Sequence, residues 1–113
     1  MPRCKDKKEL LFYPWDEKPL TKDSEGILSP NNSSPLSHLQ ISMILVPCLS
    51  VDKNLTRLGY GGGYFDKLRR DNDWRNVPCI GVLTSNCVST IPLTRAEWDI
   101  PLSGFITEKE IFV

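Results

Sequence analysis

The stretch Arg57–Asp66 reads RLGYGGGYFD and contains four of the seven glycines in the chain. An apolar run, Ile41–Pro47, comes shortly before it, and an amphipathic segment, Tyr64–Arg70, follows it at once. Glycine adopts backbone angles that are closed to other residues and lets a ligand approach the main chain. A strand, a glycine loop and a helix start present unpaired N–H groups and a favourable dipole to an anion. The order of these segments therefore predicts a phosphate-binding loop.

This loop does not match the common nucleotide-binding glycine motifs. A Walker A loop needs Gly-Lys followed by Ser or Thr, which the stretch lacks. The pattern G-x-G-x-x-G fails because Tyr64 stands where a third glycine should follow Gly59 and Gly61. A tight turn without a ligand is the alternative, although a plain turn rarely needs four glycines, each of which costs chain entropy on folding. The stretch is therefore a glycine loop of a kind different from the Walker A and G-x-G-x-x-G loops.

The segments around the loop predict an α/β domain with a mainly parallel sheet. Two apolar runs, Ile41–Val46 and Cys79–Leu83, have the character of strands that are buried on both faces. Gly104–Thr107 predicts a third strand, and Tyr64–Arg70 predicts a short helix between the first two. Strand, helix and strand in this order form a βαβ unit, which is usually right-handed. Leu10–Tyr13 predicts a further short strand.

The length of 113 residues suits one domain covering residues 1–113. Residues 21–37 are rich in Asp, Ser, Gly, Pro and Asn, and this composition predicts a long loop. The remaining strands and helix make a sparse core for an independent domain.

Composition and charge exclude several classes of protein. Fourteen basic and fourteen acidic residues balance, so no basic surface indicates nucleic-acid binding. No apolar run approaches the roughly 18 residues of a membrane span, and the first residues have no secretory apolar region. The four cysteines form no C-x-x-C pair, which favours reduced thiols, with Cys48 and Cys79 as small buried residues. We expect a cytoplasmic monomer that binds neither nucleic acid nor membranes.

The loop residues resemble a known family. Arg57–Asp66 is similar to the signature of the 5-formyltetrahydrofolate cyclo-ligases, also called methenyltetrahydrofolate synthetases. Upstream, Met43–Asp52 (MILVPCLSVD) resembles the strand and the VPGLAFD segment of that family. Downstream the resemblance continues through Cys79–Leu83, Ile91-Pro92, Glu97–Pro101 and Phe105–Glu108.

The resemblance implies a three-layer α/β/α fold of the NagB/RpiA/CoA-transferase-like type with a mainly parallel sheet. It is dense from about residue 43 to residue 107, and Met1–Cys4 resembles the end of an early core strand of the family. The family's N-terminal helices, first strands, basic nucleotide contacts and a substrate-contacting glutamate have no counterpart here. The chain is therefore expected to be the C-terminal portion of a larger domain, with close to half of a typical member missing.

The reaction implied by the resemblance uses ATP to cyclise 5-formyltetrahydrofolate to 5,10-methenyltetrahydrofolate, with release of ADP and phosphate. Arg57 and Tyr64 are the expected catalytic residues, since an arginine pairs with phosphate as a bidentate donor and a tyrosine can stack or donate its hydroxyl. A structural salt bridge for Arg57 and packing onto the sheet for Tyr64 are the alternatives. The residues expected to bind ATP are Arg57, Leu58, Gly59, Tyr60, Gly61, Gly62, Gly63, Tyr64 and Phe65.

The metal expected from the resemblance is Mg²⁺, held by Asp66 and Asp99. A carboxylate beside a phosphate loop suits a hard cation. Asp66 could instead serve as a dipole partner at the helix start, and Asp99 as a turn or cap residue. Asp52 follows the first strand, and we expect it to hold the loop in shape rather than to face the ligand.

One substitution departs from the family pattern. Cys48 stands where relatives carry a glycine at the exit of the first strand. If that position requires a positive φ angle, cysteine strains the turn by about 1–2 kcal/mol.

Three functions remain open from the sequence. The first is an ATP- and Mg²⁺-dependent cyclo-ligase. The second is a truncated or non-catalytic relative that binds nucleotide or folate weakly without turnover. The third is an unrelated βαβ phosphate binder, such as a sugar-phosphate enzyme, which requires the loop match to be accidental.

Overall fold

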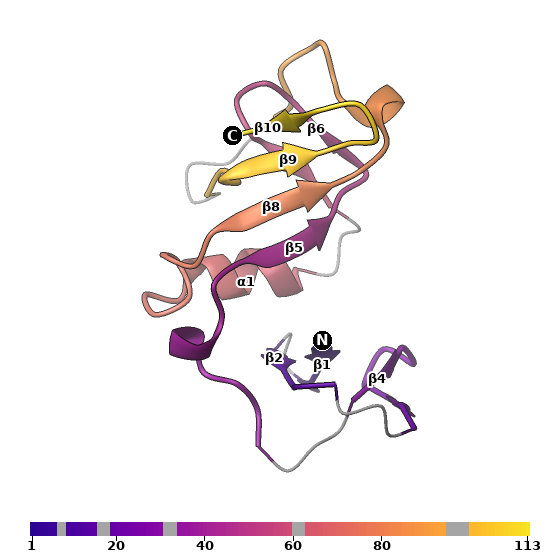
Figure 1. Cartoon of the computed structure of the whole chain (residues 1–113), viewed down its shortest axis with the longest axis vertical. Coiled ribbons are helices and arrows are strands. Elements are labelled where there is room, and N and C mark those ends of the chain that lie inside the picture. Colours follow the sequence, from indigo (N-terminus) through magenta and orange to yellow (C-terminus); the bar gives the residue numbers. More distant parts are fainter. Residues whose placement is uncertain (7–8, 16–18, 31–33, 60–62, 95–99) are drawn as a thin grey trace.

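The centre of the molecule is a four-stranded sheet in the order β10-β9-β8-β5 (Figure 1), seen in a computed structural model that describes residues 1–6, 9–15, 19–30, 34–59, 63–94 and 100–113. β5, β8 and β9 are parallel, and β10 pairs antiparallel with β9 at one edge. The predicted α/β fold with a mainly parallel sheet is therefore confirmed. The strands of this sheet are β5 (Ile44–Pro47), β8 (Cys79–Val82), β9 (Gly104–Ile106) and β10 (Ile111–Phe112).

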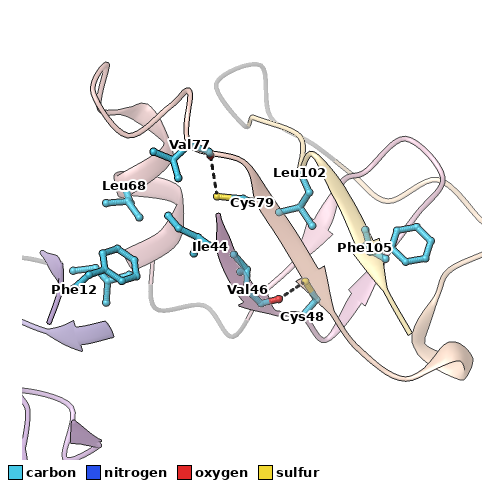
Figure 2. Close-up of a cluster of buried hydrophobic side chains, with 11 residues drawn as sticks. Phe12, Ile44, Val46, Cys48, Leu68, Val77, Cys79, Leu102 and Phe105 are labelled. Atoms are coloured by element: carbon cyan, nitrogen blue, oxygen red, sulfur yellow. Dashed lines mark hydrogen bonds between the residues drawn. The ribbon is translucent and has the colours of Figure 1, made fainter. Parts of the chain in front are cut away.

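The helix between the first two parallel strands is α1 (Tyr64–Arg70), as the sequence predicted. It begins after Gly63, whose φ of 78° is a left-handed conformation that suits glycine. α1 packs against one face of the sheet, where Leu68 joins the buried cluster drawn in Figure 2. Among the described residues α1 is the only α-helix, so helical cover lies on one face of the sheet.

The core contains both cysteines that were expected to be buried. Cys48 is 6% exposed and Cys79 is fully buried, and Figure 2 shows their side chains within the cluster. Burial raises the pKa of each thiol above its usual value, which keeps both neutral. Cys48 does not have a positive φ, so the strain that its replacement of a glycine could have caused is absent.

A second antiparallel pair, β6 (Ser50–Val51) and β7 (Arg57–Leu58), extends from the end of β5. The polar turn between them is organised by Asp52, which is 2% exposed. Its Oδ1 accepts the N–H groups of Asn54 and Thr56, both at 2.9 Å. Asp52 thus holds the loop in shape, as expected, and the hairpin itself is a feature that the sequence did not predict.

The N-terminal residues form two small antiparallel pairs below β5 in Figure 1: β1 (Pro2–Cys4) with β2 (Leu10–Phe12), and β3 (Thr21–Lys22) with β4 (Leu28–Ser29). The predicted strand at Leu10–Tyr13 is confirmed by β2.

Two expectations for this region need correction. Residues 21–37 are not loop throughout, since they contain β3 and β4, and β1 is not a strand of the central sheet. The buried side chain of Arg3 supplies the physical reason. Its Nη1 donates to the carbonyl and the hydroxyl oxygens of Thr21 and Ser29, and its Nη2 donates to the carbonyl of Lys22. Arg3 thereby fixes β1 to the β3–β4 hairpin.

Two short 3₁₀ helices, η2 (His38–Gln40) and η3 (Ser85–Cys87), complete the described elements. No helix in the described ranges has both the length and the apolar character needed to cross a lipid bilayer.

Candidate functional site

A groove of about 760 Å³ lies between the N-terminal strands and the glycine loop. One bank comes from the N-terminal strands and the β3–β4 turn, and the other from β5, β7 and the start of α1. The first bank consists of Pro2, Cys4, Leu10, Asp23, Glu25 and Ile27, and the second of Leu45, Pro47, Arg57, Leu58, Gly59, Gly63, Tyr64, Phe65 and Asp66. Seven of the eleven residues predicted as site residues therefore line one groove.

The other four predicted residues, Tyr60, Gly61, Gly62 and Asp99, lie outside the described residues. The two described ends of the glycine loop, Gly59 and Gly63, both face the groove. Gly59 also has little space above its Cα, because a Cβ built there would lie 2.6 Å from Nη2 of Arg57. The loop therefore runs directly past a guanidinium group.

Arg57 sits at the centre of the polar part of the groove. Its side chain is 14% exposed, and Nη1 lies 3.7 Å from Oδ1 of Asp66, whose side chain is 60% exposed. The guanidinium stacks 5.3 Å from the centre of the Phe65 ring, and Nε donates to the carbonyl of Pro47 at 3.4 Å. Arg57 therefore forms the ion pair that was the structural alternative, and it also lines the groove.

Asp66 lies in the first turn of α1, where a negative charge is favourable to the helix. Its exposed carboxylate borders the groove and also a smaller cavity of about 70 Å³. Ile100, the residue after Asp99 in the sequence, lines that smaller cavity as well. No group of three or more His, Cys, Asp and Glu side chains with metal-binding proximity occurs in the ranges that the structure describes.

Tyr64 reaches across the groove. Its hydroxyl donates to Oε1 of Glu25 at 2.5 Å, which joins the start of α1 to the turn between β3 and β4. The hydrogen bond to Glu25 raises the pKa of Tyr64, because ionisation would place a phenolate beside a carboxylate. Sequence reasoning missed Glu25, since an acid in a polar turn carries no signal of a partner 39 residues away.

Apart from Asp23, Glu25 and the polar residues around Arg57, the groove is lined mainly by apolar side chains. Leu45 and Leu58 are each more than half exposed on one bank, and Ile27 is 58% exposed on the other. An apolar groove with a few polar groups at one end is typical of small-molecule sites. The arrangement suits a ligand with a ring at one end and an anionic group near Arg57.

The smaller cavity is bounded by a second arginine that the sequence analysis did not select. Nη1 of Arg69 donates to the carbonyls of Arg75 and Val77, each at 2.9 Å, and Nη2 donates to that of Pro101 at 3.3 Å. Arg69 therefore connects α1 to the segment before β8 and to the segment before β9. Its guanidinium has a structural role in the wall of the site.

Comparison with protein families gives a match over residues 1–108 to the 5-formyltetrahydrofolate cyclo-ligase family. The chain is 33% identical over 99 residues to the 5-formyltetrahydrofolate cyclo-ligase of Haemophilus influenzae, which covers 82% of this chain and 51% of the relative. It is 28% identical over 105 residues to the 5-formyltetrahydrofolate cyclo-ligase of Escherichia coli K12, which covers 91% of this chain and 56% of the relative. The chain thus spans about half the length of these curated relatives.

Two solved structures are similar over nearly the whole chain. The 5,10-methenyltetrahydrofolate synthetase of Aquifex aeolicus matches with a TM-score of 0.74 and 27% identity, over 98% of this chain and 55% of that protein. The 5,10-methenyltetrahydrofolate synthetase of Mycoplasma pneumoniae matches with a TM-score of 0.63 and 25% identity, over 96% of this chain and 54% of that protein. With the family match over nearly all of its length, the chain belongs to the 5-formyltetrahydrofolate cyclo-ligase family.

Proposed function

We propose that this chain provides the phosphate-binding part of an enzyme that uses ATP to cyclise 5-formyltetrahydrofolate to 5,10-methenyltetrahydrofolate. In this reaction the formyl oxygen is phosphorylated, N10 attacks the activated carbon, and phosphate leaves. Family membership supports the reaction class. It also removes the third function considered above, an unrelated phosphate binder.

The observation that carries the proposal is the shared groove. Gly59 and Gly63 line it together with Arg57, Tyr64 and Asp66. A glycine loop folded away from any cavity would have contradicted a phosphate site. Its described ends instead border a groove of about 760 Å³, next to a guanidinium group.

Arg57 is the residue that we propose donates hydrogen bonds to the phosphate. Phosphoryl transfer depends on positioning and on neutralising negative charge, and a guanidinium does both because it donates two parallel hydrogen bonds. Contacts with Phe65 and with the Pro47 carbonyl already orient the side chain. A phosphate group would then replace or share the ion pair that Arg57 makes with Asp66.

Asp66 and Asp99 are the proposed ligands of Mg²⁺. The exposed carboxylate of Asp66 is a hard oxygen donor beside the proposed phosphate position, which fits this metal. Asp99 lies outside the described residues and is proposed from the family resemblance alone. When bound, Mg²⁺ would supply positive charge to the phosphate oxygens during transfer.

Tyr64 and the apolar bank are proposed to hold the organic part of a ligand. Leu58 and Phe65 offer apolar area, and Tyr64 offers a ring face or, if released from Glu25, a hydroxyl donor. We propose a cytoplasmic monomer, and the reduced thiols of Cys4, Cys48, Cys79 and Cys87 agree with the cytoplasmic location.

The test is Asp66→Asn, with Asp73→Asn as a matched control at an exposed acid beyond the end of α1. Asp66→Asn should abolish ATP-dependent formation of 5,10-methenyltetrahydrofolate, followed by the absorbance of the product, while Asp73→Asn should leave the rate unchanged. MgATP affinity should fall by about tenfold in Asp66→Asn, whereas affinity for ATP in EDTA should be the same as in the wild type. Full turnover in Asp66→Asn would reject the metal role.

A non-catalytic relative that binds nucleotide or folate is the second candidate, and the half-length match to the relatives favours it. The two candidates differ in one measurement. The wild-type chain would bind MgATP without forming product if the second holds, and the Asp66→Asn effect on MgATP binding would remain. Absence of MgATP binding by the wild type would reject both.

A further inference from the structure

The turn between β3 and β4 holds the backbone of Glu25 in a fixed place beside the groove. Oδ1 of Asp23 accepts the N–H groups of Glu25 at 2.8 Å and of Ile27 at 3.0 Å. Oδ2 of the same carboxylate accepts the N–H of Cys4 at 2.9 Å, which ties the turn to β1. The N–H of Gly26 donates to the Asp23 carbonyl at 3.0 Å and closes the turn. The fold therefore positions Glu25 from two sides.

The carboxylate of Glu25 has acceptor capacity that the protein does not use. Its Oε1 accepts the Tyr64 hydroxyl, and Oε2 has no partner among the described residues. No lysine or arginine of the described ranges forms an ion pair with this carboxylate. Because the side chain is exposed and lines the groove, it presents a negative charge and a free acceptor oxygen to a ligand there.

The charges of the groove orient a ligand. On the opposite bank, Arg57 offers a guanidinium to the anionic group of a ligand, and Glu25 would repel a second anion on its own bank. A group with N–H donors is the complement of an unneutralised carboxylate. The apolar side chains of Ile27 and Leu58 lie on the two banks and suit the faces of a flat ring. The groove is thus complementary to a ring that carries N–H donors on its edge.

We propose that Glu25 determines the ligand specificity of the groove by accepting hydrogen bonds from an amino-substituted ring edge. Such an edge carries an exocyclic NH₂ group beside a ring nitrogen, and it is present both in adenine and in the 2-amino-4-oxopyrimidine ring of a reduced folate. Tyr64 lies beside the carboxylate and offers its ring face to the same ligand ring. The inference rests on the proposed function, which names MgATP and 5-formyltetrahydrofolate as the two sources of this edge.

The test is calorimetry of the full chain with Glu25→Gln. Glutamine keeps one acceptor oxygen for Tyr64 but replaces the other with an NH₂ group, which opposes an N–H donor of the ligand. Affinity for MgATP or for 5-formyltetrahydrofolate should fall by about tenfold, and the ligand that responds is the one whose ring lies at Glu25. Glu9→Gln is the matched control, since Glu9 is an exposed acid in the β1–β2 turn that does not line the groove, and it should leave both affinities unchanged.

Ligands without the amino group separate recognition from a general loss of structure. ITP carries an oxo group where ATP carries its amino group, and a 2-desamino analogue of 5-formyltetrahydrofolate lacks the 2-amino group. The wild type should bind the analogue of the responding ligand about tenfold more weakly than the parent ligand. Glu25→Gln should bind parent and analogue with the same affinity, because the partner of the amino group is gone.

Three results would overturn the proposal. Equal affinities of the wild type and Glu25→Gln for both ligands would remove the specificity role of Glu25 and leave the proposed function intact. An equal loss for a parent ligand and its analogue would show that Glu25 only supports the groove. If the wild type bound neither ligand, the inference and the proposed function would both be rejected.

Discussion

At the scale of single residues, Gly59 and Arg57 form one unit. The guanidinium occupies the space where a side chain at position 59 would begin, with Nη2, Cζ and Nη1 lying 2.6, 2.7 and 2.9 Å from an ideal Cβ. A glycine at this position is therefore required by the neighbouring arginine rather than by its own backbone angle. The glycine at position 59 therefore leaves room for the guanidinium that we propose binds phosphate.

We expect Gly59→Ala to displace the Arg57 guanidinium with little loss of stability, because the atoms in conflict are the end of a flexible side chain. MgATP affinity should fall by about tenfold, measured by calorimetry, while the melting temperature should stay close to that of the wild type. In an Arg57→Ala background the same change should have no further effect on affinity. An additive loss in the double variant would show that Gly59 acts on the ligand without Arg57.

Glu25 controls the ionisation of Tyr64. The carboxylate accepts a hydrogen bond from the phenol and disfavours the phenolate, and so the pKa of Tyr64 lies above its usual value. We expect Glu25→Ala to lower this pKa towards about 10, measured by tyrosinate absorbance with Tyr64→Phe identifying the signal. Glu25→Gln, which retains an acceptor without the charge, should give an intermediate value. Identical titrations of the wild type and Glu25→Ala would exclude the contact in solution.

The raised pKa of Tyr64 determines how the stability contributed by the contact with Glu25 changes with pH. A folded-state pKa above the unfolded value means that the protonated phenol is favoured by folding. The stabilisation is thus fully present below the unfolded pKa of tyrosine, about 10, and is lost as the pH rises through the folded-state value. The difference in stability between the wild type and Glu25→Ala should therefore shrink in strongly alkaline solution.

At the scale of elements, the β6–β7 hairpin positions Arg57, and Asp52 maintains the hairpin. Besides accepting two N–H groups within its own turn, Asp52 accepts the N–H of Leu93 through Oδ2 at 2.7 Å. The carboxylate thereby connects the hairpin to the segment after the β-bridge between Val51 and Val88. A buried acceptor that satisfies three backbone donors is costly to remove.

Asp52→Ala should lower the free energy of unfolding by about 3 kcal/mol, because it leaves the N–H groups of Asn54, Thr56 and Leu93 without their acceptor. Chemical denaturation measures this change. Asp52→Asn keeps one carbonyl oxygen and should lose less than Asp52→Ala. Equal stability of the alanine variant and the wild type would mean that water replaces the carboxylate.

Sequence periodicity predicted the elements that are long enough to carry a pattern. β5, β8 and β9 come from apolar runs, and α1 has the expected bounds. The pairs β3–β4 and β6–β7 and the strand β10 were not predicted, because strands of two residues contain no repeat to detect. These short strands pair because of contacts such as those of Arg3 and Asp52. The partners of Arg3 are distant in the sequence, and the N–H groups that Asp52 binds in its own turn come close only when that turn forms.

At the scale of the whole molecule, the chain is an α/β unit in which the only described α-helix covers one face of the central sheet. The N-terminal strands join the rest through the Phe12 ring, whose centre lies 5.2 Å from that of Trp74, and through the hydrogen bond between Tyr64 and Glu25. The groove between these two parts is bordered by Leu45 and Pro47 of β5, which is the last strand of the described sheet.

The sequence by itself determined the parallel strands, the helix, the glycine loop and the family, because these rest on local apolar patterns and on a contiguous motif. Only the tertiary structure decided that Glu25 meets Tyr64 and that Arg57 pairs with Asp66 beside Gly59. The physical reason is that these features arise from residues brought together by packing and by backbone hydrogen bonds, and their separation along the chain leaves no periodic signal.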